Sequence, residues 1–172
     1  MSFTSNDTLR KIEKLLPESI HNQSVPKDVL GVIDEYIPKL NNKNISQVVK
    51  DYLSNSSKTK QQVIDNYGPI NNWDVSQVTN LSELFKYCQH FNENISKWNV
   101  SNVTNMRDMF CGAIAFNQSL NNWNVSNVVD MSHMFDGANN FNQSLHYWDV
   151  SKVVNMKAMF SNTRLVPMNE WY

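Results

Sequence analysis

Ionisable side chains recur at a fixed interval in the second half of the chain. Glu83, Asp108 and His133 are each separated by 25 residues. If units of that length stack, these three groups form one row, a candidate partner-binding edge that could bind a cation or respond to pH. The alternative interpretation is a solvated face of the repeat, with no chemistry of its own.

The remaining reactive residues show no catalytic pattern. The four histidines have unrelated offsets, and the two cysteines, Cys88 and Cys111, have no metal-ligand spacing. No Ser-His-Asp order or phosphate-binding loop is present, and four glycines could not build several such loops. We therefore expect a protein that is not an enzyme and has no cofactor and no metal. The rival hypothesis, an enzyme, requires ionisable side chains that converge in a closed pocket.

Composition excludes two classes of partner. The 172 residues contain 15 basic and 16 acidic side chains, so the chain lacks the basic surplus that binds phosphates. No apolar run approaches the roughly 18 residues of a membrane span, and no export signal is visible at residue 1. We expect no nucleic acid partner, no membrane insertion, and a cytoplasmic or virion-associated location.

Four repeats of 25 residues, spanning residues 70–163, must position these side chains. Such a short unit cannot bury its own apolar face, so stacking of neighbours must do so. The structural columns are tryptophan (Trp73, Trp98, Trp123 and Trp148), phenylalanine (Phe85, Phe110, Phe135 and Phe160) and amide or carboxyl (Asn80, Asn105, Asp130 and Asn155). We expect the aromatic columns to point inward, and the polar column to bond one coil to the next.

Each repeat combines two local patterns. Trp-x-Val-x-x-Val-x-x-Met predicts short parallel strands, and Met-x-x-Met-Phe-x-x-Ala predicts one or two helical turns. The column of Tyr87, Gly112, Gly137 and Asn162 follows that turn, where a left-handed residue would end it. The predicted fold class is therefore an α/β repeat, a leucine-rich-repeat-like solenoid of four units with an α-helical N-terminal cap.

The repeat resembles a known family. Trp-Asp/Asn-Val-Ser-x-Val-x-x-Met-x-x-Met-Phe, followed by Phe-Asn-Gln-Ser-Leu, is similar to the BspA-like leucine-rich-repeat surface proteins of bacteria, protists and large DNA viruses. The resemblance implies attachment and protein–protein contact. Because no export signal or lipid anchor is visible, we expect a structural or assembly role in a large DNA virus. A cell-surface adhesin is the alternative.

Residues 1–69 carry no repeat and predict four helices, at about 7–16, 26–37, 45–53 and 58–66, with Asn44 capping the third. The stretch from Val25 to Pro38 is similar to the opening helix of an F-box, and residues 45–53 loosely match its second half. That resemblance implies a substrate adaptor of a ubiquitin ligase, with a Skp-type adaptor as partner. The alternative is that the helices only cap the first repeat.

Residues 164–172 break the repeat. Val166, Pro167 and Met168 stand where another Phe-Asn-Gln-Ser would fall. Something must cover the open edge of the last repeat. We expect this segment to fold back as a C-terminal cap, and a partner protein is the alternative.

Overall fold

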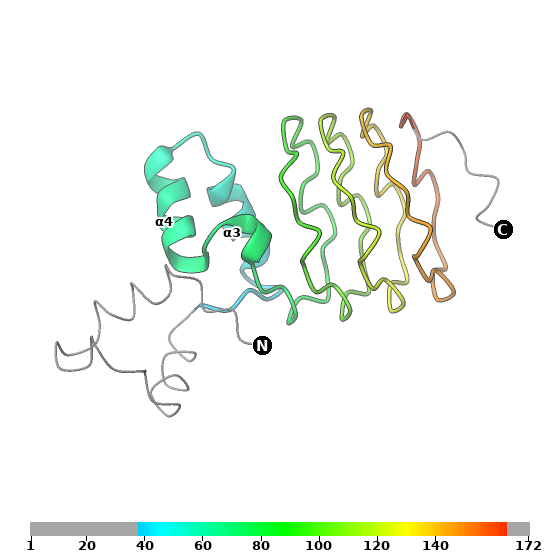
Figure 1. Ribbon diagram of the computed structural model, residues 1–172, viewed down its shortest axis with the longest axis horizontal. Coiled ribbons are helices and arrows are strands. Elements are labelled where there is room, and N and C mark those ends of the chain that lie inside the picture. Colours follow the sequence, from blue (N-terminus) through cyan, green and yellow to red (C-terminus); the bar gives the residue numbers. More distant parts are fainter. Residues whose placement is uncertain (1–37, 165–172) are drawn as a thin grey trace, which may run out of the picture.

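A computed structural model describes residues 38–164, in which a helical pair leads into a stack of narrow coils (Figure 1). The elements are α3 (Ile45–Tyr52), α4 (Ser57–Tyr67) and the 3-10 helix η2 (Ile70–Asn72). After η2 the chain winds through successive coils that advance away from the helices (Figure 1). The predicted helices at 7–16 and 26–37, the F-box-like stretch and the segment after Arg164 lie outside the described residues.

The third and fourth predicted helices are present, within one or two residues of their expected limits. In α3 the apolar residues recur at spacings of three and four, so that they share one face. The buried residues of this face are Ile45, Val48, Val49 and Tyr52. The α4 helix is amphipathic to a lesser degree and buries Val63 alone. No helix in residues 38–164 is both long enough and apolar enough to cross a membrane.

The two helices begin differently. Ser56 caps α4, because its hydroxyl oxygen accepts a hydrogen bond from the Thr59 N–H at 3.3 Å. Asn44 precedes α3 as predicted, but it makes no side-chain bond to a helix amide. Its carboxamide oxygen instead accepts from the Asn41 N–H at 2.9 Å. The predicted capping bond of Asn44 is therefore wrong, because the preceding turn uses the acceptor.

The predicted fold class, an α/β leucine-rich-repeat-like solenoid, is wrong. Both α-helices in the described residues precede the repeats, and no β-strand is present anywhere in 38–164. The repeats are built of turns. Parallel pairing between them is confined to the isolated bridges Asn80–Asn105, Asn105–Asp130 and Asp130–Asn155.

The backbone dihedral angles explain why neither strand nor helix forms. Glu83, Asp108, His133 and Ala158 have φ of 60°, 56°, 55° and 54°. The Leu84 N–H donates to the Leu81 carbonyl at 3.3 Å, which closes a turn with positive φ at its third residue, the mark of a type II turn. A left-handed residue this early interrupts any helix, so the predicted helical turns are wrong.

A second left-handed column follows four residues later, as predicted. Tyr87, Gly112, Gly137 and Asn162 have φ of 58°, 68°, 71° and 57°. Two of the four are glycines, the residue that adopts this conformation without steric cost. At position 112 the need is also spatial, because a Cβ there would approach Tyr87 Cδ1 to 2.5 Å. Each coil therefore bends twice at fixed positions.

The aromatic columns fill the interior of the stack. The four tryptophans of the repeat column are buried, and of the phenylalanine column only Phe160, in the last coil, is partly exposed. Successive phenylalanine rings are parallel within 6°, with centroids 5.5 Å apart for Phe85–Phe110 and for Phe110–Phe135. The indole N–H of Trp123 donates to the Ile95 carbonyl at 3.2 Å, and Trp98 and Trp148 repeat this bond. The aromatic side chains thus link one coil to the next by packing and by hydrogen bonds.

The polar column closes local turns. Asn105 accepts from the Arg107 N–H at 2.9 Å and Asp130 from the Ser132 N–H at 2.8 Å, the pattern of an Asx turn. One side-chain bond of this column crosses between coils, from Asn155 Nδ2 to Asp130 Oδ2 at 3.4 Å. The expectation that this column bonds coil to coil is therefore mostly wrong, since the neighbouring turn amide competes for the acceptor.

A different asparagine column crosses between coils. The Asn102 and Asn127 carboxamides donate to the Ser76 and Ser101 carbonyls at 2.8 and 2.9 Å. These asparagines lie at exposed positions, where they satisfy carbonyls of the preceding coil. Asparagine therefore does bond coil to coil here, at a position one residue after the serine column and not at the predicted one.

Candidate partner-binding surface

The predicted row of ionisable groups lies along the left-handed bends of the stack. Asp108 is its most buried member, with 6% of the residue exposed. Its carboxylate lies 3.4 Å from the Lys86 ammonium of the preceding coil and 3.1 Å from Nε of Arg107. Two cations therefore surround one carboxylate.

These contacts decide the charge of Asp108. Burial acts to raise the pKa of the carboxyl group, but hydrogen bonds and charge attraction from Arg107 and Lys86 outweigh it and hold the pKa below its ordinary value of 3.8. Asp108 is thus an anion at neutral pH, and it is already paired. Its environment is that of an ion pair between coils, not of a group poised to accept a proton.

The other two members of the row also pair with near neighbours. Glu83 lies 3.4 Å from the Lys86 ammonium, and His133 Nδ1 lies 3.1 Å from Asp136 Oδ2. In the part of the chain that the structure describes, no group of three or more His, Cys, Asp or Glu side chains could hold a metal ion. Among these contacts, the pair of Lys86 and Asp108 joins two adjacent coils, and the others lie within one coil. The geometry therefore favours local polar pairing of these side chains and not a cation site.

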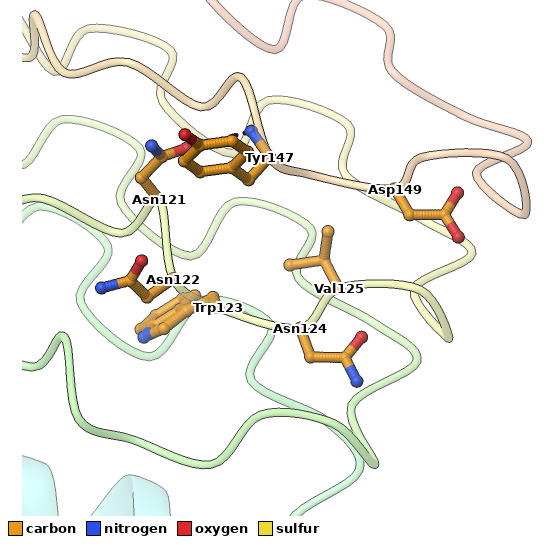
Figure 2. A pocket seen from close by; sticks show the side chains of 7 residues that line it. All are labelled: Asn121, Asn122, Trp123, Asn124, Val125, Tyr147 and Asp149. Carbon is orange, nitrogen blue, oxygen red and sulfur yellow. Dashed lines mark hydrogen bonds between the residues drawn. The ribbon is translucent and has the colours of Figure 1, made fainter.

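Sequence reasoning missed an open hollow of about 340 Å³ between the third and fourth coils (Figure 2). Its lining residues are Asn121, Asn122, Trp123, Asn124, Val125, Tyr147 and Asp149. Residues 121–125 form one side, and Tyr147 and Asp149 project from the next coil (Figure 2). Two adjacent repeats therefore contribute to one concave surface.

Tyr147 is the most conspicuous residue of this hollow, because 74% of it is exposed. Its backbone N–H donates to the Asn121 carboxamide oxygen at 3.1 Å, which fixes the start of the coil that carries it. In the preceding repeats the same column holds Asn72, Lys97 and Asn122. A single aromatic residue in an otherwise polar column was the sequence signal that could have identified this position.

Asp149 supplies a carboxylate at the edge of the hollow. Hydrogen bonds from the side chain and the backbone of Ser151 hold the pKa of this carboxyl group below its ordinary value, and the backbone bond measures 3.0 Å. The group is fully ionised at neutral pH. The lining thus combines the Tyr147 ring with the Asp149 carboxylate and with the carboxamides of Asn121, Asn122 and Asn124, a combination suited to a polar protein surface.

Comparisons with known proteins identify one match. The family model described as "Mycoplasma protein of unknown function, DUF285" matches residues 51–171. No curated protein and no solved structure gives a significant match. The matched region contains all four repeats and agrees, at the level of the family, with the resemblance to BspA-like proteins. Because the match covers most of the sequence, the chain belongs to the DUF285 family.

Proposed function

We propose that this chain is a non-catalytic protein-interaction module, whose stacked coils present a partner-binding surface centred on Tyr147. One observation carries the proposal: a tyrosine that is 74% exposed stands over an open hollow on an otherwise amide-rich stack. Tyrosine is enriched at interface hot spots, since it combines a large apolar ring with a hydroxyl group that can bond a partner. The hollow beside the ring can receive a side chain of the partner.

The surface is also held in place before any partner arrives. Tyr147 is followed by Trp148, whose indole N–H donates to the Leu120 carbonyl of the preceding coil at 2.9 Å. On the other side of the hollow, the Trp123 indole makes the equivalent bond to Ile95. A rigid backbone on both sides reduces the entropy lost on binding, which favours affinity.

The experiment compares two tyrosines of similar exposure. The intact chain is first immobilised, incubated with an extract of its host and treated with a cross-linker. Mass spectrometry then identifies the captured proteins, which are the candidate partners. We expect the purified partner to bind the Tyr147→Ala variant at least tenfold more weakly, as is typical of a hot-spot tyrosine. Tyr87→Ala is the matched control, because Tyr87 is 67% exposed but lies outside the hollow. Equal affinity of the two variants would contradict the proposal.

A narrower role is also proposed for the N-terminal region. The F-box-like stretch from Val25 to Pro38 precedes the family match, which begins at residue 51, so the chain carries a segment beyond the family's own region. In this hypothesis the segment binds a Skp-type adaptor while the stack binds the substrate. Binding of the intact chain to a purified Skp-type protein, abolished by Ile33→Asp, is the expected result. No binding by the unmodified chain would exclude this role.

The cellular location remains part of the proposal. We propose a cytoplasmic or virion-associated assembly protein, with a cell-surface adhesin as the alternative. Protease treatment of intact cells or particles separates the two, because a surface adhesin is digested and an internal protein is protected.

A further inference from the structure

Backbone hydrogen bonds across the left-handed bends all run in one direction. At the first interface the N–H groups of Glu83 and Phe85 donate to the Arg107 and Met109 carbonyls, both at 2.9 Å. Four such bonds form at each of the three interfaces between coils, always from the earlier coil to the later one. Along the bends, every interface therefore uses amides of the earlier coil and carbonyls of the later one, whereas elsewhere single bonds such as that from the Thr104 N–H to the Thr79 carbonyl run the other way.

This polarity leaves a row of donors on the last coil. The amides of Met156, Ala158, Phe160 and Asn162 occupy the equivalent positions, and no acceptor for them exists among the described residues. Unpaired backbone donors in a row are a template for another segment that carries carbonyl groups. The end of the stack is thus unfinished in its hydrogen bonding.

The same end is unfinished in its packing and its charge. Met156 is 41% exposed, whereas its equivalent Met131 is fully buried. Val154 is exposed as well, and Phe160 is only partly covered. The last coil also carries three cations, Lys152, Lys157 and Arg164, against the single carboxylate of Asp149. An occupant should therefore offer carbonyl acceptors, apolar side chains and a negative charge.

A second copy of the chain fits this end poorly. If two such ends met face to face, donors would oppose donors and cations would oppose cations. If the end met the first coil of another copy, the helix α3 would stand in the way, because its apolar face already packs on that coil, with the Tyr52 ring 5.3 Å from the Trp73 ring. The occupant must come from elsewhere.

We propose that residues 165–172 of the same chain lie across the last coil and accept hydrogen bonds from its free amides. The segment follows Arg164 directly and is rich in apolar side chains, namely Leu165, Val166, Met168, Trp171 and Tyr172. Glu170 is its only side chain that is charged at neutral pH, and this charge is opposite to the excess on the last coil. The family match extends to residue 171, so the segment belongs to the same family unit as the stack.

Length and chemistry are both sufficient. Eight extended residues reach about 26 Å, and the donors from Met156 to Asn162 span six residue steps, at most about 20 Å. Pro167 cannot donate a hydrogen bond but keeps its carbonyl, which is the group that a row of donors requires. The proposed cap thus supplies what the last coil lacks.

Hydrogen exchange measured by NMR on the intact chain tests this inference. We expect the amides of Ala158 and Phe160 to exchange at least tenfold more slowly than in a chain that ends at Arg164, because an acceptor protects them. The amide of His133, whose acceptor is in the fourth coil, serves as the internal control and should not change. A full-length Trp171→Ala, Leu165→Ala double variant provides the same comparison if the shortened chain fails to fold.

Three results would overturn the inference. Rapid exchange of these amides in the intact chain would leave the end open for a separate partner. Equal protection with and without residues 165–172 would show that the segment is not the occupant. Protection that rises with protein concentration would assign the end to a second copy.

Discussion

The first and the last coil of the stack have nearly the same sequence pattern but opposite surroundings. At the first coil, α3 packs on the repeat, and Leu81 and Phe85 are fully buried. At the last coil, the equivalent Met156 and Phe160 remain partly exposed within the described residues. A repeat therefore specifies how coils join, but it does not specify how the stack ends.

The difference has a physical origin in polarity. At the first coil, α3 covers the apolar face, and the Asn42 carboxamide oxygen accepts from the Thr79 and Asn80 amides at 2.9 and 3.2 Å. The last coil presents amides, which need acceptors, and a helix has few spare carbonyl groups along its sides. The two ends consequently need different covers, and the flanking sequences differ accordingly: residues 45–67 form helices, whereas residues 165–172 contain a proline and a cluster of aromatic and aliphatic residues.

The largest expected difference in stability between the two ends comes from substitutions in the phenylalanine column. Phe85→Ala should lower the free energy of unfolding by ~3–5 kcal/mol, as a fully buried ring does when it leaves a cavity. In a chain that ends at Arg164 and so lacks the proposed cap, Phe160→Ala should cost only about 1–2 kcal/mol, since its ring is partly exposed there. Urea denaturation followed by tryptophan fluorescence gives both values. Equal losses at the two ends would show that the last coil is as well covered as the first.

A substitution in the helix that covers the first coil and one on the exposed face of the last coil should follow the same order. Ile45→Ala removes a buried side chain of α3 that covers the first coil, and we expect a loss of about 3 kcal/mol. In the chain that ends at Arg164, Met156→Ala removes a side chain that is already 41% exposed, and we expect a loss near 1 kcal/mol. Thermal unfolding of the two variants provides the comparison. A larger effect at Met156 would contradict the assignment of the closed and open ends.

Substitutions at the left-handed bends test whether all coils have the same backbone conformation. Gly137→Ala should destabilise the protein by about 1–2 kcal/mol, because φ is 71° while the new Cβ would meet only ordinary contacts at 3.6 Å. Ala158→Gly in the last coil should stabilise it by up to about 1 kcal/mol, since φ there is 54°. Chemical denaturation measures both changes. Destabilisation by Ala158→Gly would mean that the last coil departs from the common backbone.

The smallest effect concerns the ion pair between the first and second coils. The pKa of Asp108 lies below its ordinary value of 3.8, so its stabilisation is complete above pH 4 or so and is lost as pH falls through the folded-state pKa. Asp108→Asn should therefore cost about 1 kcal/mol at pH 7 and progressively less below pH 4. Unfolding curves of both proteins at several pH values give the difference. A constant difference across the range would contradict the ion pair.

The columns of buried side chains were predictable from the sequence, because the same apolar residue types recur at the length of the repeat. The spacing of Trp73, Trp98, Trp123 and Trp148 is visible without a structure, and so is the left-handed position at Gly112. The local backbone was not predictable. Glu83, Asp108 and His133 are not glycines, so their positive φ angles left no mark in the sequence, and these bends replace the expected strands and helical turns.

The candidate surface was missed for a related reason. Columns reveal what the repeats share, whereas Tyr147 matters because it differs from the other members of its column. The hollow beside it depends on how two coils are offset, which no single repeat encodes. By contrast, the row of Glu83, Asp108 and His133 attracted attention through its regularity, and its members pair with neighbouring charges.

The central claim is that, along the bends, amides of each coil bond to carbonyls of the next. Hydrogen exchange at the interior bends tests this claim most directly. The amides of Asp108 and Phe110 donate to the third coil at 2.9 and 2.8 Å, whereas the amide of the exposed residue Arg107 bonds only to the nearby side chain of Asn105. We predict that Asp108 and Phe110 exchange slowly, with opening free energies close to that of global unfolding, and that Arg107 exchanges much faster. Rapid exchange at all three amides would contradict the stack.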